Sequence, residues 1–102
     1  MKIALTNTPP DKGEDIAKTL VEEHLVACVN FYPIQSVYFW KGEACMDKEI
    51  TLMMKVAADG VEALKKRLLE LHPYELPEFV VLEVDTQASL EEYVKWVRHE
   101  TK

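Results

Sequence analysis

The stretch Tyr38-Phe39-Trp40-Lys41-Gly42-Glu43-Ala44 separates two long runs of strand-like residues, at 26–40 and 44–56. Lys41-Gly42 supplies a glycine where the turn of a tight hairpin needs a positive φ angle. The two runs are therefore expected to pair as antiparallel strands of one long hairpin. The remaining elements have to be arranged around this pair.

Three helices are predicted outside the hairpin from capping residues and apolar periodicity. Each should begin at an oxygen-bearing side chain that lies three residues before a glutamate. These pairs are Asp11 with Glu14, Asp59 with Glu62, and Ser89 with Glu92. Apolar residues then recur at helical spacing, so each helix should lay one face on the rest of the protein. The residues in question are Ile16, Ala17, Leu20 and Val21, then Val61, Leu64, Leu68 and Leu71, then Leu90, Tyr93, Val94 and Val97.

Two further strands are expected at residues 3–8 and 79–84, which gives the order βαββαβα in one domain spanning 1–102. A helix follows the first strand and another follows the third, as right-handed crossovers onto one sheet face require. The predicted fold class is therefore α+β, a ferredoxin-like βαββαβ arrangement with a long central hairpin and an additional C-terminal helix.

The face of this sheet that the first two helices leave uncovered is unusually apolar. Strand 79–84 offers apolar residues to both faces, and the hairpin tip adds Tyr38, Phe39 and Trp40 on arms longer than two helices can cover. Buried apolar area is worth ~25 cal/mol per Å². We expect a homo-oligomer in which these tip residues form part of the interface. The alternative is that the third helix alone folds over the open face.

Composition excludes several classes of protein. Eighteen acidic residues against twelve Lys and Arg leave a formal charge of -6, which argues against a nucleic-acid partner. Apolar runs have strand length, so no membrane insertion is expected. No targeting segment is visible, and the isolated Cys28 and Cys45 form neither a disulfide framework nor a zinc motif. These features favour a cytoplasmic protein.

Site-like chemistry concentrates in His72-Pro73-Tyr74-Glu75-Leu76-Pro77-Glu78. The first proline should end a helix at His72, and the second should leave Leu76 extended. An imidazole, a phenol and two carboxylates are thus expected in one stiff connector, which loses little entropy when a ligand binds. An ordinary helix-to-strand junction has the same features, and there His72 would interact with the helix dipole and the last carbonyls.

Several blocks of the chain together resemble the CutA family of divalent-cation tolerance proteins. They are Leu25-Val26-Ala27-Cys28-Val29-Asn30, Trp40-Lys41-Gly42-Glu43, Asp47-Lys48-Glu49, Lys55, His72-Pro73-Tyr74-Glu75 with Pro77-Glu78, and Tyr93, Trp96 and Val97. The resemblance covers essentially the whole chain. It implies a ferredoxin-like fold in a tight homotrimer related to PII-type signalling proteins, a cytoplasmic location, and a role in tolerance of, or response to, copper and other divalent metals.

The resemblance also implies candidate metal ligands. Some members carry a histidine pair before the motif's proline and a cysteine near the end of the first strand, where this chain has Leu71-His72 and Leu5-Thr6. His72 is the one ligand retained, and one imidazole does not make a selective copper site. We therefore predict a metal site of His72 and Cys28, with Tyr74, Glu75 and Glu78 lining a ligand cleft between subunits. The competing interpretation of Cys28 is a buried, inert thiol.

No motif of an enzyme is present. The chain lacks GxSxG, HExxH and P-loop sequences and contains three glycines in all, so a non-enzymatic role is predicted. Two functions stay open. One is a trimer that binds a divalent metal cofactor such as copper. The alternative is a PII-like signalling or scaffold trimer that binds a partner protein or small metabolite without metal.

Overall fold

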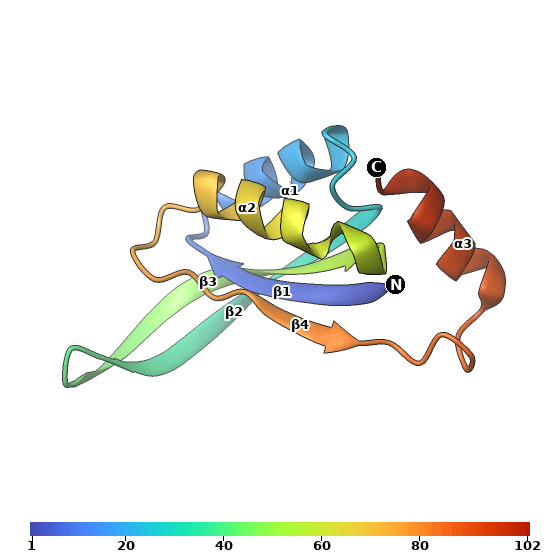
Figure 1. Cartoon of the computed structure of the whole chain (residues 1–102). Helices are drawn as coiled ribbons and strands as arrows, with labels where there is room; N and C mark the ends of the chain where they lie inside the picture. The colour runs from blue at the N-terminus through green and yellow to red at the C-terminus, as the bar shows by residue number, and fades with distance from the viewer.

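The computed structural model describes all of residues 1–102, and it confirms the predicted fold class (Figure 1). The elements along the chain are β1 (Lys2–Thr8), α1 (Gly13–Glu22), β2 (Cys28–Trp40), β3 (Glu43–Val56), the short 3-10 turn η1 (Ala58–Gly60), α2 (Val61–Leu71), β4 (Val80–Glu83) and α3 (Glu91–Glu100). The strands form one four-stranded sheet in the order β2-β3-β1-β4, with every neighbouring pair antiparallel. This is the ferredoxin-like arrangement with an added C-terminal helix.

The hairpin of β2 and β3 forms as predicted. Its ladder runs without interruption from the pair Cys28 and Lys55 to the pair Trp40 and Glu43. The two turn residues, Lys41 and Gly42, have φ angles of 51° and 83°, as a type I′ turn requires. Figure 1 shows the closed end of this hairpin projecting well beyond the helices.

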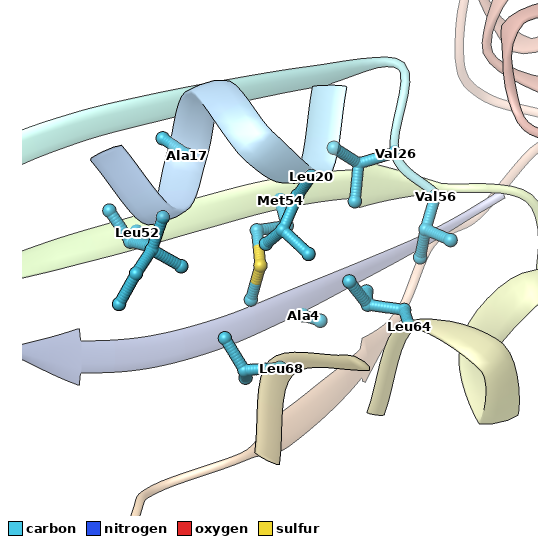
Figure 2. Close-up of a cluster of buried hydrophobic side chains, with 10 residues drawn as sticks. Ala4, Ala17, Leu20, Val26, Leu52, Met54, Val56, Leu64 and Leu68 are labelled. Atoms are coloured by element: carbon cyan, nitrogen blue, oxygen red, sulfur yellow. The ribbon is translucent and has the colours of Figure 1, made fainter. Parts of the chain in front are cut away.

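A single apolar core lies between the sheet and the two helices α1 and α2, which cover the same face (Figures 1 and 2). Its members are Ala4, Ile16, Ala17, Leu20, Val26, Leu52, Met54, Val56, Leu64 and Leu68. Strand alternation explains which strand residues lie in the core, because Ala4 on β1 and Met54 on β3 are register partners that point to the same face. Each fully buried leucine stabilises the fold by roughly 1.5–3 kcal/mol.

The predicted side-chain caps are wrong. The N-cap residues are Lys12, Gly60 and Leu90, and none makes a side-chain capping hydrogen bond. At the start of α1 the chain packs tightly against β3, because a Cβ on Gly13 would lie 2.8 Å from the Ile50 Cγ2 atom. Asp85 explains the region before α3, because its Oδ1 atom accepts the backbone N–H groups of residues 87 and 88. None of the three predicted capping oxygens therefore fixes the start of a helix.

The last helix lies at one end of the sheet and leaves most of the second face open. Val97 is fully buried, and the Thr101 hydroxyl accepts the Ala57 N–H at 3.2 Å, which anchors α3 beside the end of β3. On the open face of β4, Val80 and Leu82 remain 44% and 45% exposed. In a single chain, α3 therefore does not cover the face opposite α1 and α2.

Candidate functional site

The connector between α2 and β4 forms the corner expected from its two prolines. Helix α2 ends at Leu71, and His72 is its C-cap with extended backbone angles (φ -77°, ψ 130°). Pro73 follows and prevents another helical turn. Residues 74–76 form a bend rather than extended chain, and the strand begins only at Val80. The corner thus projects from the sheet edge toward the hairpin.

The His72 ring is held from both of its nitrogens. Nε2 lies 2.8 Å from the carbonyl oxygen of Asn7 on β1, and the backbone N–H of Tyr74 donates to Nδ1 at 3.2 Å. An Nδ1 that accepts a hydrogen bond leaves Nε2 as the protonated nitrogen that donates to the carbonyl. Burial lowers the pKa of His72, although the Asn7 carbonyl and the charge of Glu49 act in the opposite direction. The ring is therefore a neutral imidazole that fixes the corner to β1.

This arrangement corrects the interpretation of His72 as a partner of the helix dipole. The ring bonds the carbonyl of a strand distant in sequence, and its lowered pKa disfavours the cationic form that a helix C-terminus would stabilise. It also bears on metal binding. Nε2 carries the proton and the lone pair of Nδ1 accepts the Tyr74 N–H, so neither nitrogen is available for a metal unless the corner moves.

The structure does not bring Cys28 and His72 together. Cys28 opens the edge strand β2 and pairs with Lys55, which in turn pairs with Ile3 on β1. The His72 ring lies at Asn7, four residues farther along β1, which corresponds to ~13 Å of strand. Cys28 is half-buried and lies beside Tyr93, whose pKa is raised first by burial and then by this thiol. Within one chain, the two predicted ligands do not fit a shared metal ion.

Two polar side chains link the corner to the sheet. The Tyr74 hydroxyl donates to Glu49 Oε2 on β3 at 2.7 Å, and Asn7 Nδ2 lies 3.4 Å from Glu78 Oε1. Asn7 Oδ1 also accepts the Thr51 hydroxyl at 2.7 Å. Glu49, Thr51 and Asn7 share the sheet face opposite the core. The carboxylates of the corner therefore meet a polar end of an otherwise apolar face.

A groove of about 640 Å³ separates the corner from the hairpin. It is lined by Asn7, Ser36, Val37, Tyr38, Phe39, Trp40, Glu49, Tyr74, Glu75, Leu76 and Glu78. The predicted cleft residues Tyr74, Glu75 and Glu78 thus share one surface with the predicted interface residues Tyr38, Phe39 and Trp40. The lining carries three carboxylates and no basic side chain.

The charges of the groove affect one another. Burial, followed by the negative charge of Glu49, raises the pKa of Glu78. The Tyr74 pKa is raised by burial and by its bond to Glu49. On the hairpin, the Tyr38 hydroxyl bonds Asp47, which raises the pKa of Tyr38 to about 12. Both phenols therefore remain protonated donors at neutral pH, and the groove keeps a negative potential.

Five residues of this groove were not among the predicted site residues, namely Asn7, Ser36, Val37, Glu49 and Leu76. Of these five, Glu49 and Asn7 bond side chains of the corner. A signal for each is present in the strand pattern. Glu49 continues the outward-facing positions of Thr51 and Met53 on β3, and Asn7 continues those of Ile3 and Leu5 on β1. A carboxylate and an amide at the ends of outward-facing apolar rows mark a polar site that strand alternation alone does not explain.

No three side chains of His, Cys, Asp or Glu lie close enough together in the chain to hold a metal ion. No helix has both the length and the apolar character needed to cross a membrane. The geometry thus offers an acidic, aromatic groove in place of a preformed metal centre.

Comparison with known proteins shows relatives along the whole chain. A 66% identical structure described as PII-like protein CutA from Nostoc sp. PCC 7120 in apo form superposes with a TM-score of 0.99, covering 100% of this chain and 98% of that one. The divalent-cation tolerance protein CutA of Pyrococcus horikoshii is 39% identical, covering 100% of this chain and 99% of its own length. A 25% identical Archaeoglobus fulgidus structure, described as periplasmic divalent cation tolerance protein CutA, gives a TM-score of 0.93 and covers 100% of both chains.

Residues 2–100 match the family model described as CutA1 divalent ion tolerance protein. The match contains every strand and helix of the fold, the hairpin turn and the groove. The chain therefore belongs to the CutA1 divalent ion tolerance family.

Proposed function

We propose that this protein acts as a cytoplasmic homotrimer that binds divalent cations, copper among them, at the groove between the hairpin and the corner. The observation that carries the proposal is the lining of that groove, with three carboxylates and no basic residue. The family description names tolerance of divalent ions and no reaction, which agrees with the absence of catalytic motifs.

The carboxylates supply the kind of ligand that a hydrated divalent ion accepts. The pKa of Glu78 is raised by burial and, to a smaller extent, by the negative charge of nearby Glu49. A cation between them relieves this repulsion and displaces any proton from Glu78, so binding should tighten as pH rises. The three carboxylates of the groove do not lie close enough together in one chain to hold an ion by themselves, so water or a second copy of the chain has to complete the coordination.

Association is supported by the apolar surface that a single chain exposes. On one face of the hairpin, Phe39 is 78% exposed, and the register pair Val37 and Met46 extends the same stripe. Val80 and Leu82 form a second exposed row on the open sheet face. Exposure of both surfaces to water is unfavourable, and burying them between copies removes that cost. The number three comes from the family resemblance.

Calorimetric titration of chelator-stripped protein with Cu²⁺ tests the cation proposal. Saturable binding is expected, with a marked loss in Glu78→Gln and retention in His72→Gln and Cys28→Ser. Loss of binding in His72→Gln or Cys28→Ser, with Glu78→Gln unaffected, would move the ion to the nitrogen and sulfur ligands predicted from the sequence. Absence of saturable heat from the unsubstituted protein would overturn the proposal.

A further inference from the structure

Glu49 is the one acidic residue of the chain that is buried. It is only 7% exposed, and it lines the groove. One carboxylate oxygen accepts the Tyr74 hydroxyl, and none of the ion pairs in the chain includes Glu49. A buried charge without a counter-ion is costly, and charged residues are seldom fully buried unless they are paired. A single chain therefore holds a negative charge at the groove that it does not neutralise itself.

Lys55 is the corresponding exception among the lysines and arginines. It is partly buried, and none of the ion pairs in the chain includes it. Two other basic residues are partly buried, and both have acidic partners, because Lys2 pairs with Glu83 and Arg67 pairs with Glu23. The remaining lysines and arginines are exposed, so water solvates their charges. One chain thus leaves a single partly buried cation without a partner.

These two residues lie on the open face of the sheet. On β3 they alternate with the core residues Leu52, Met54 and Val56. Their side chains therefore point away from α1 and α2. Six residues of strand separate them, which corresponds to ~20 Å, so they do not meet within one chain. Figure 1 shows β3 running from the hairpin tip to the end of the sheet beside α3. Glu49 thus lies toward the hairpin and Lys55 toward α3.

The surface between the two charges is apolar. Leu5 on β1 is the register partner of Val80 on β4, and Val80 and Leu82 are 44% and 45% exposed. A second copy that covers this surface can bring its Lys55 end to the Glu49 end of the first. We propose that Lys55 of one copy is the counter-ion of Glu49 in a neighbouring copy, where their open faces meet. In a closed ring each copy gives one lysine and receives another, so every buried charge is paired.

This inference rests on the homotrimer of the proposed function, and it names the group of the second copy that completes the groove. The lysine and a divalent cation both neutralise Glu49, so they compete for it. Excess EDTA removes the cation and leaves the lysine to be tested alone. Sedimentation of the unsubstituted protein tests the assembly, whereas substitutions at the two positions test the charge pair.

Charge reversal measures the contact between copies. Isotopically labelled and unlabelled copies are mixed in EDTA, and native mass spectra follow the rate at which mixed particles form. Lys55→Glu places two carboxylates at each contact, so exchange should be at least about 30-fold faster. Adding Glu49→Lys restores opposite charges in reversed order and should slow exchange again. Lys65→Glu, on the exposed surface of α2, is the matched control and should exchange at the unsubstituted rate.

A neutral pair of substitutions keeps the test valid if a reversed variant fails to fold. Lys55→Met leaves Glu49 buried without a counter-ion, and it should speed exchange about 30-fold. Combining it with Glu49→Gln removes the unpaired charge and keeps an acceptor for Tyr74. The combined variant should therefore exchange more slowly than Lys55→Met alone. If the two residues did not meet, their effects on the rate would multiply instead.

Three results would overturn the inference. A single-chain particle from the unsubstituted protein would remove the homotrimer and the charge pair together. An assembled protein whose Lys55→Glu and Lys55→Met variants exchange at the unsubstituted rate would remove the charge pair and leave the homotrimer standing. Faster exchange that neither substitution of Glu49 reverses would show that Lys55 contacts a different group.

Discussion

The two faces of the sheet differ in how far one chain covers them. The face under α1 and α2 is closed by apolar side chains from every neighbouring element, and its leucines are completely buried. The opposite face and the hairpin carry apolar residues of similar size that one chain leaves in water. The first side accounts for the stability of the fold. The second is stable as a surface only when something covers it, which is why the groove and the proposed interfaces all lie there.

The largest expected effect on the free energy of unfolding is a difference between two leucines that lie on opposite sides of the sheet. Leu64 lies on α2 and is fully buried in the core, whereas Leu76 is 71% exposed at the rim of the groove. Leu64→Ala should lower the free energy of unfolding by about 2–5 kcal/mol, because it leaves a cavity in a packed core. Leu76→Ala should change it by less than about 0.5 kcal/mol if that surface stays in water. Denaturant unfolding of both variants measures the difference.

The result for Leu76→Ala shows whether the rim of the groove is exposed in the assembled protein. A cost near that of Leu64→Ala would show that the groove rim is buried in the assembled protein. Equal, small costs for the two variants would contradict the assignment of stability to the helix-covered side.

An intermediate effect is expected at His72, which ties the two sides together. His72→Ala removes the bond to the Asn7 carbonyl and the acceptor for the Tyr74 N–H, and should cost about 1–3 kcal/mol. His72→Gln keeps a donor for the carbonyl and should lose less. Denaturant midpoints for the three proteins at neutral pH give the order.

The same residue predicts a pH dependence. Because the folded protein lowers the pKa of His72 below its ordinary value of 6.5, the unfolded chain binds the proton more readily. The His72 contribution to stability is therefore complete above pH 6.5 and is lost as the pH falls below it. Unfolding free energies of the unsubstituted protein should fall through this range more steeply than those of His72→Gln. Parallel curves would show that the His72 ring is not held neutral.

Much of this fold could be predicted from the sequence, because its signals are local and redundant. The apolar spacing of residues 16–20 and 61–71 indicates two amphipathic helices, and Lys41-Gly42 has the φ angles its hairpin requires. The helix starts could not be predicted in the same way. Asp11, Asp59 and Ser89 match a capping pattern, but the N-cap residues are Lys12, Gly60 and Leu90, and none makes a side-chain capping bond.

Only part of the candidate site could be predicted from the sequence. Tyr74, Glu75 and Glu78 lie in one connector, so their proximity follows from the sequence. That Trp40 and Glu49 line the same groove depends on the register of the sheet and the twist of the hairpin, which no local sequence pattern indicates. The separation of Cys28 from His72 depends on register in the same way.

The most direct test of the difference between the two faces is sedimentation of the protein at low concentration. If copies of the chain cover the open face and the hairpin, the particle should have three times the 11.8 kDa mass of one chain. A compact, folded particle of 11.8 kDa would show that the exposed side needs no cover, and would contradict the account.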